Sequence, residues 1–278
     1  MQRSSVLGLV STIVLCVISG CASTSEFGLD RRHAGRQHEI DVERGRPNKV
    51  LDGVGWVLGV PSKLALWDRR AENHDISPET EEFVVSYLQD MGRSDVLVRV
   101  NQYDPVGEWN RLARNRDIGL GWRMTSGTLE TLKYTLLPGR VFGEDWYNPF
   151  TNTLNLYSDI PSLAVAKAAY AEDVDSREWP GTYATTQILP LANMWHETIA
   201  TREALSYIRA TGTESEVEEA YRVLYPSYGG SWGAGVGSFI PFGNAYARLA
   251  GSAVGHVANG IRQVAASDGD AGPAEFAD

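Results

Sequence analysis

Apolar residues recur at helical spacing along several stretches of the chain, and each such stretch predicts a helix with one apolar face. The clearest contains Phe83, Val84, Tyr87 and Leu88. It begins after Ser77, a good N-cap, and ends at Gly92. Similar patterns predict helices over residues 107–114, 161–175 and 191–210, and a further helix capped by Thr213 or Ser215.

Strict alternation of apolar and polar residues predicts strands elsewhere. Residues 96–103, "VLVRVNQY", alternate and are β-branched. In residues 153–157, Leu154 and Leu156 point one way, whereas Thr153, Asn155 and Tyr157 point the other, which predicts a half-buried strand with one polar face. Residues 129–142 are expected to form one or two strands broken at Pro138-Gly139.

This order of elements predicts an α+β fold, with a small sheet packed on several helices and a helix-rich C-terminal half. Residues 50–228 are expected to form the main domain. At its start, residues 50–67 are apolar and rich in glycine, and they either pack on the domain or touch a membrane.

The C-terminal region, residues 229–265, is rich in glycine. Ala247, Gly251 and Gly255 lie four residues apart, so on a helix they form one ridge of small residues that allows a second helix to approach closely. This region is either an element close-packed in protein or a membrane-associated hairpin, and Arg248 and His256 argue against a full span. Residues 266–278 form an acidic, disordered tail by composition.

The N-terminus carries the features of a secretory signal over residues 1–20: Arg3, an apolar run, and small residues before Cys21. The sequence "ISGC" resembles a bacterial lipobox. The resemblance implies cleavage before Cys21 and attachment of diacylglycerol, carrying chains such as palmitate, to the cysteine sulfur. Residues 22–49 would then be a tether that spans roughly 25–30 Å.

The composition agrees with a location in the cell envelope. Cys16 leaves with the signal and Cys21 is lipidated, so the mature domain contains no disulfide. The net charge of −10 does not suit nucleic acid or bare anionic lipid. We therefore expect a periplasm-facing protein on the cell membrane or outer membrane, held by its N-terminal lipid.

Residues 142–210 resemble the core of the zincin metallopeptidases, in which a substrate-binding strand precedes a helix carrying His-Glu-x-x-His. The strand "NTLNLYS" precedes the helix "AVAKAAYAED", and "MWHETIATREAL" offers a second helix. This stretch is also similar to bacterial membrane-associated proteins of unassigned function. On the zincin pattern, Ala166 and Tyr170 stand at the two histidines and Lys167 at the general base. Glu197 stands at the third ligand.

None of the three substituted positions suits zinc, since Ala166 has no donor atom and Lys167 would repel the ion. The resemblance therefore implies a degenerate zincin-like core without metal, cofactor or catalytic residues. If the resemblance is false, the helix is ordinary core, with an apolar stripe at Leu163, Ala166, Tyr170 and Val174.

Three functions remain open from the sequence. The first is a non-catalytic envelope protein that binds or scaffolds a protein or peptide along Thr153, Asn155 and Tyr157, the polar side of the strand. The second is an envelope hydrolase with a non-standard site near His196 and Glu197. The third is a structural, membrane-associated protein that acts through its glycine-rich C-terminal region.

Overall fold

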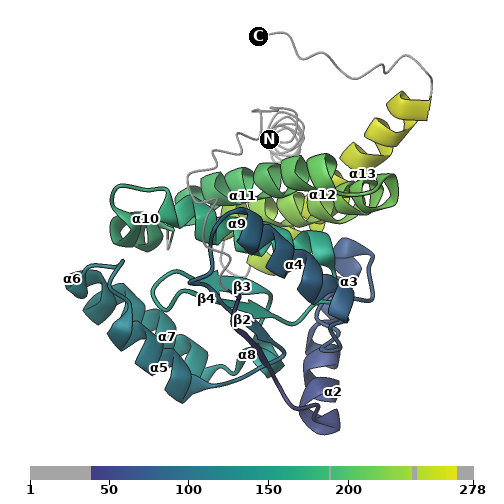
Figure 1. Cartoon of the computed structure of the whole chain (residues 1–278). Helices are drawn as coiled ribbons and strands as arrows, with labels where there is room; N and C mark the ends of the chain where they lie inside the picture. Colours follow the sequence, from purple (N-terminus) through teal and green to yellow (C-terminus); the bar gives the residue numbers. More distant parts are fainter. Residues whose placement is uncertain (1–38, 188, 240–242, 268–278) are drawn as a thin grey trace. The chain divides into compact units, whose positions relative to one another are not determined.

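The structure, a computed structural model, describes residues 39–187, 189–239 and 243–267 (Figure 1). The predicted signal peptide, Cys21, most of the predicted tether and residues 268–278 lie outside these ranges. The chain divides at Asn193 into two compact units. This division lies inside the helix α11 (Pro190–Thr211). The predicted glycine-rich region begins at residue 229, which lies inside α12 (Glu214–Gly237).

The first unit is built around a small mixed sheet of four strands, in the order β1-β2-β4-β3. The strands are β1 (Val42–Arg44), β2 (Leu97–Val100), β3 (Trp146–Asn148) and β4 (Thr153–Leu156). β1, β2 and β4 run parallel, and β3 pairs antiparallel with β4. The described chain is α+β and mostly helical, as the sequence predicts.

An apolar helix, α9 (Pro161–Asp175), covers one face of this sheet and contacts β3, β4 and α4 (Pro78–Asp90). Leu154 and Leu156 of β4 are fully buried. Tyr147 of β3 lies edge-on against Tyr170 of α9, with ring centroids 5.5 Å apart. The helices predicted after Ser77 and over residues 161–175 are confirmed as α4 and α9. Ser77 caps α4 as expected by accepting a hydrogen bond from the Thr80 amide.

The opposite face of the sheet is covered by α5 (Pro105–Arg114) and α7 (Thr128–Leu136). Adjacent residues of a strand point to opposite faces. Accordingly, Trp146 contacts Tyr134 of α7 and Asn148 reaches Glu108 of α5, while Tyr147 between them faces α9.

The prediction of strands over residues 129–142 is wrong. The segment forms α7 and a short helix, α8 (Gly139–Phe142). Thr131 and Tyr134 are its buried positions, and their spacing of three residues is helical. Pro138, which cannot donate an amide hydrogen bond, separates the two helices. A three-residue helix, α6 (Leu120–Trp122), and a π-helical turn, η1 (Arg123–Gly127), precede α7.

The predicted peptide-binding strand is present, but it is not an edge. Leu154 and Asn155 do point to opposite faces, as expected. However, β4 pairs with β2 on one side and β3 on the other, and all four of its residues are buried. Thr153 and Asn155 are therefore not available for edge pairing with a peptide, because both edges of β4 are already hydrogen-bonded. Tyr157, the third residue expected on the binding strand, directly follows β4 and is fully buried.

Two short helices precede α4. Asn48 caps α2 (Lys49–Leu58), and Gly59 leads into α3 (Val60–Leu66). α2 contacts α8 as well as α3. A further short helix, α10 (Pro180–Thr186), follows α9.

In the second unit, α12 and α13 (Gly243–Ser267) pack along each other. Thr213 caps α12 and forms a capping box with Glu216. The ridge of Ala247, Gly251 and Gly255 lies at the contact between these helices. Within the described residues, no helix combines the length and apolarity that crossing a membrane requires.

The contact between α12 and α13 leaves no room for a side chain at the two glycines of the ridge. A Cβ atom added to Gly251 would lie 2.0 Å from the carbonyl oxygen of Gly229, whereas one added to Gly260 would meet nothing within 4 Å. We expect Gly251→Ala to destabilise the chain by about 1–3 kcal/mol through overpacking. Gly260→Ala should instead stabilise it by up to about 1 kcal/mol through helix propensity. Urea denaturation followed by circular dichroism measures both, and equal effects would contradict the packing described.

Candidate functional site

The three zincin positions on α9 are used for packing and charge balance. Ala166 is buried, and Tyr170 packs against Tyr147. Burial raises the pKa of the Asp145 carboxyl. Hydrogen bonds from Ser158 and the positive charge of Lys167 both act in the opposite direction and lower that pKa. Lys167 therefore contributes to the charge balance of a fully buried carboxylate.

The fourth position is not part of the same unit. Glu197 and the buried His196 lie on α11 beyond the division at Asn193, whereas α9 lies before it. Among the described residues, no three histidine, cysteine, aspartate or glutamate side chains lie together as a metal site would need.

The main polar centre of the first unit is a buried ion pair on the opposite face of the sheet. Arg99 of β2 is 1% exposed and Glu108 of α5 is 0% exposed, and Arg99 Nη1 lies 2.5 Å from Glu108 Oε2. Arg99 Nε also donates to Glu43 Oε2 of β1 at 2.9 Å. Burial by itself lowers the pKa of Arg99, but the charges of Glu108 and Glu43 raise it above its ordinary value.

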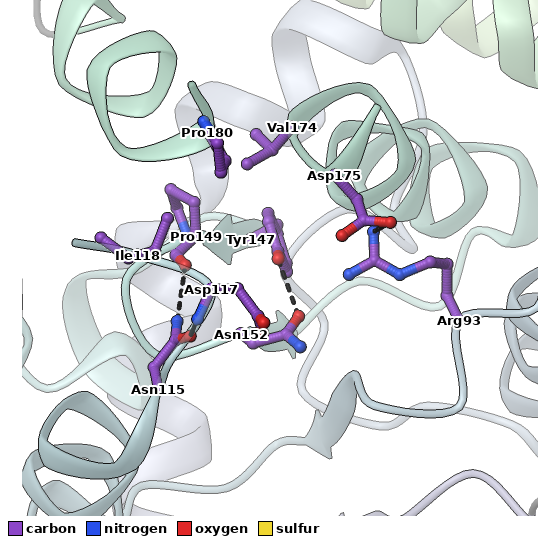
Figure 2. A pocket seen from close by; sticks show the side chains of 10 residues that line it. All are labelled: Arg93, Asn115, Asp117, Ile118, Tyr147, Pro149, Asn152, Val174, Asp175 and Pro180. Atoms are coloured by element: carbon purple, nitrogen blue, oxygen red, sulfur yellow. Dashed lines mark hydrogen bonds and ion pairs between the residues drawn. The ribbon is translucent and has the colours of Figure 1, made fainter. Parts of the chain in front are cut away.

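The second oxygen of Glu108 holds the turn between β3 and β4, which has the sequence "NPFTN". Asn148 Nδ2 donates to Glu108 Oε1 at 3.0 Å, and Thr151 Oγ1 donates to the same oxygen at 2.5 Å. The turn ends at Asn152, whose backbone is left-handed with φ of 53°. Tyr147 Oη donates to Asn152 Oδ1 at 2.7 Å (Figure 2).

A small pocket of about 20 Å³ lies beside this turn (Figure 2). Most of its polar groups already have partners. Arg93 makes two hydrogen bonds to Asp95 and lies 3.8 Å from Asp175. Asn115 Nδ2 donates to the carbonyl oxygen of Phe150 at 2.9 Å. The pocket is therefore lined mainly by groups that stabilise the turn, and its volume has room for about one water molecule.

Asn155 lies on the same polar face and is fully buried, with its amide oxygen and nitrogen both lacking a hydrogen-bond partner among the described residues. Such a group ordinarily costs stability. Sequence reasoning selected Asn155 for its polarity, but the structure places it inside the sheet and not on a binding surface.

A second polar cluster lies beneath α2 and α3. The pKa of Glu72 is raised to about 7, first by burial and also by the charges of Glu144 and Asp145, although a hydrogen bond with Ser62 opposes the shift. Lys63 Nζ donates to the Glu72 carbonyl oxygen at 3.0 Å. A carboxyl that titrates near neutrality is chemically able to transfer protons.

The neighbouring His74 is also buried. It shares a hydrogen bond of 3.1 Å between its Nδ1 and Asn101 Oδ1, and burial lowers its pKa. Glu72 and His74 both have left-handed backbones, with φ of 46° and 59°. Such backbone strain is often found at functional sites, although structural turns carry it too.

Sequence reasoning missed both polar clusters. The one available signal was Arg99, a charged residue in the middle of an otherwise apolar strand, since a buried charge requires a partner. Comparison of the chain with protein-family models, with curated proteins and with solved structures finds no match.

The Arg99–Glu108 pair makes a testable contribution to stability. Glu108→Gln would leave the Arg99 charge without its fully buried partner, and we expect a loss of about 3 kcal/mol in the free energy of unfolding. The matched control is Glu130→Gln on α7, which removes an ion pair of 3.7 Å with the exposed Lys133 and should cost less than about 0.5 kcal/mol. Urea denaturation compares the two, and a similar small loss for both would show that the buried pair is not required.

Proposed function

We propose that the protein is a lipid-anchored cell-envelope protein that binds or scaffolds another protein, with a zincin-like core that has no zinc chemistry. The main support for this proposal is the role of three residues on α9. Ala166 and Tyr170, which stand at the two histidine positions, pack against their surroundings, and Lys167 balances a buried carboxylate. At these three positions the helix supports the sheet and offers no histidine or carboxylate ligand for zinc.

The exposed side of α7 supports the binding role. Leu129, Leu132 and Leu136 are spaced as one face of a helix and are all exposed, while Thr131 and Tyr134 face inward. Glu130 and Lys133 lie on the same helix and form an ion pair in which Lys133 is exposed and Glu130 half-buried. Exposed apolar patches with polar residues at their rim are typical of surfaces that bind proteins or membranes. We infer that a partner protein contacts α7 in place of the buried strand β4.

The anchoring part of the proposal comes from the "ISGC" sequence and is tested by acyl labelling in the producing cell. Wild-type protein should incorporate an alkyne-tagged palmitate and sediment with the membranes. Cys21→Ser should lose the label, because the sulfur that accepts the lipid is gone. Cys16→Ser is the matched control and should keep it, because Cys16 would be removed with the signal. Equal labelling of all three proteins would refute lipidation at Cys21.

The non-catalytic part is tested by metal content. The chain from residue 21 onward, with Cys21→Ser, should contain far less than one zinc per chain after dialysis against a weak chelator, measured by plasma mass spectrometry. The comparison is the triple variant Ala166→His, Lys167→Glu, Tyr170→His, which supplies the missing zincin residues. Zinc uptake by the folded triple variant alone would support zincin ancestry. One zinc per wild-type chain would contradict the proposal.

A further inference from the structure

The helix α2 has its polar side turned toward the protein. Asp52 accepts hydrogen bonds from Arg140 Nε at 2.7 Å and from Asn101 Nδ2 at 3.2 Å. Gly55 lies so close to the domain that an added Cβ would be 2.4 Å from His74 Nε2. The inward face of α2 is therefore an aspartate in an ion pair and a glycine, which is the reverse of an ordinary surface helix.

The apolar side of α2 consequently faces outward. The exposed fraction is 73% for Val50 and 61% for Val57, and it lies between 40% and 50% for Leu51, Val54, Trp56 and Leu58. Leu64 of α3 is also exposed, as is Trp67, which directly follows α3 in the chain. We call residues 49–67 the apolar segment.

Charge is absent from the middle of the apolar segment. No charged residue occurs between Asp52 and Lys63. Lys63 itself is buried, because its Nζ donates to the carbonyl oxygens of Trp56 and Glu72 and its charge lies over the Trp56 ring. Asp52 and Lys63 are thus both drawn inward, and the outward side is left to aliphatic and tryptophan side chains.

Three features favour a lipid bilayer as the occupant of this surface. The helices of ten and seven residues are too short to cross a membrane but long enough to lie in its interface. Trp56 and Trp67 are residues typical of the boundary between headgroups and acyl chains. Although the net charge of the chain is −10, the exposed cations Arg46, Lys49 and Arg69 lie at or beside the two ends of the segment, where they would meet anionic headgroups.

The position of the segment in the chain points the same way. Cys21, the proposed acylation site, precedes α2 with only residues 22–48 between them. A lipid at Cys21 would keep the apolar segment close to a bilayer at all times, which raises its effective concentration there. The second apolar surface, on α7, differs because it carries Glu130 and Lys133.

We propose that the apolar segment docks into the interfacial region of a bilayer containing anionic phospholipid. The lipid at Cys21 would then hold the protein on a membrane, and the segment would lay the first unit against its surface. This inference rests on the proposed function for the presence of the bilayer, but the contact itself requires no acyl chain.

The experiment uses the chain from residue 21 onward with Cys21→Ser, which cannot be acylated. It is sedimented with vesicles made of phosphatidylethanolamine and phosphatidylglycerol in equal parts, and with vesicles of phosphatidylcholine alone. We expect binding to the first kind and binding at least several-fold weaker to the second. The double variant Val54→Asp, Val57→Asp should lose at least tenfold in affinity for the first kind, because it places charge on the outward side only.

The matched control is Val257→Asp, Val264→Asp on α13, which makes the same changes at residues that are 63% and 60% exposed. Its binding should stay within about twofold of the parent protein. Circular dichroism checks that both variants melt as the parent does.

Equal binding by the parent protein and the α2 variant would overturn the inference, as would loss of binding in the α13 variant alone. Absence of vesicle binding would also overturn it. If the parent protein were then dimeric by ultracentrifugation and the α2 variant monomeric, the occupant would be a second copy. Failure of the Cys21 labelling experiment would leave this result unaffected, so the two proposals fail separately.

Discussion

Arg99 lies in the middle of the central sheet, where its guanidinium is shielded from water and its charge must be balanced from within the first unit. Glu108 and Glu43 provide that balance, and an unpaired charge at this position would cost several kcal/mol. The same Glu108 carboxylate holds Asn148 and Thr151. One side chain thus connects α5, the central strand β2 and the turn between β3 and β4, and the polar face of the sheet can be buried only when these three are together.

The two faces of the sheet are stabilised in different ways. The face under α9 gains from the burial of Leu154, Leu156 and the Tyr147–Tyr170 contact, at roughly 25 cal/mol for each Å² of apolar surface removed from water. The face under α5 depends on hydrogen bonds whose geometry fixes where that helix lies. The difference between the two faces has a consequence for α9. Its side chains that pack against the sheet cannot at the same time present nitrogen or oxygen ligands to a metal.

Two helices of the first unit, α2 and α7, expose apolar side chains along one face. On α2 and α7, polar or small residues face the protein and aliphatic residues face away from it. On both helices, the inward groups are fixed by specific partners, Arg140 for Asp52 and the Asp104 amide for Tyr134. The outward apolar residues follow from that orientation, since a helix held by its polar side must expose the other. Both surfaces agree with a protein that works against a membrane and a partner.

The sequence by itself determined the elements whose signals are local. Ser77 and Thr213 mark helix starts because a cap acts on amides within three residues, and Pro161 marks one because its fixed φ suits the first helical position. The alternation in Thr153–Leu156 indicates a strand by its local pattern alone. Only the tertiary structure decided which faces are buried. Glu108 meets Asn148 40 residues later, and Asp52 meets Arg140 88 residues later. These contacts between distant residues bury the polar side of β4 and turn the apolar side of α2 outward, so no pattern within either segment could have revealed them.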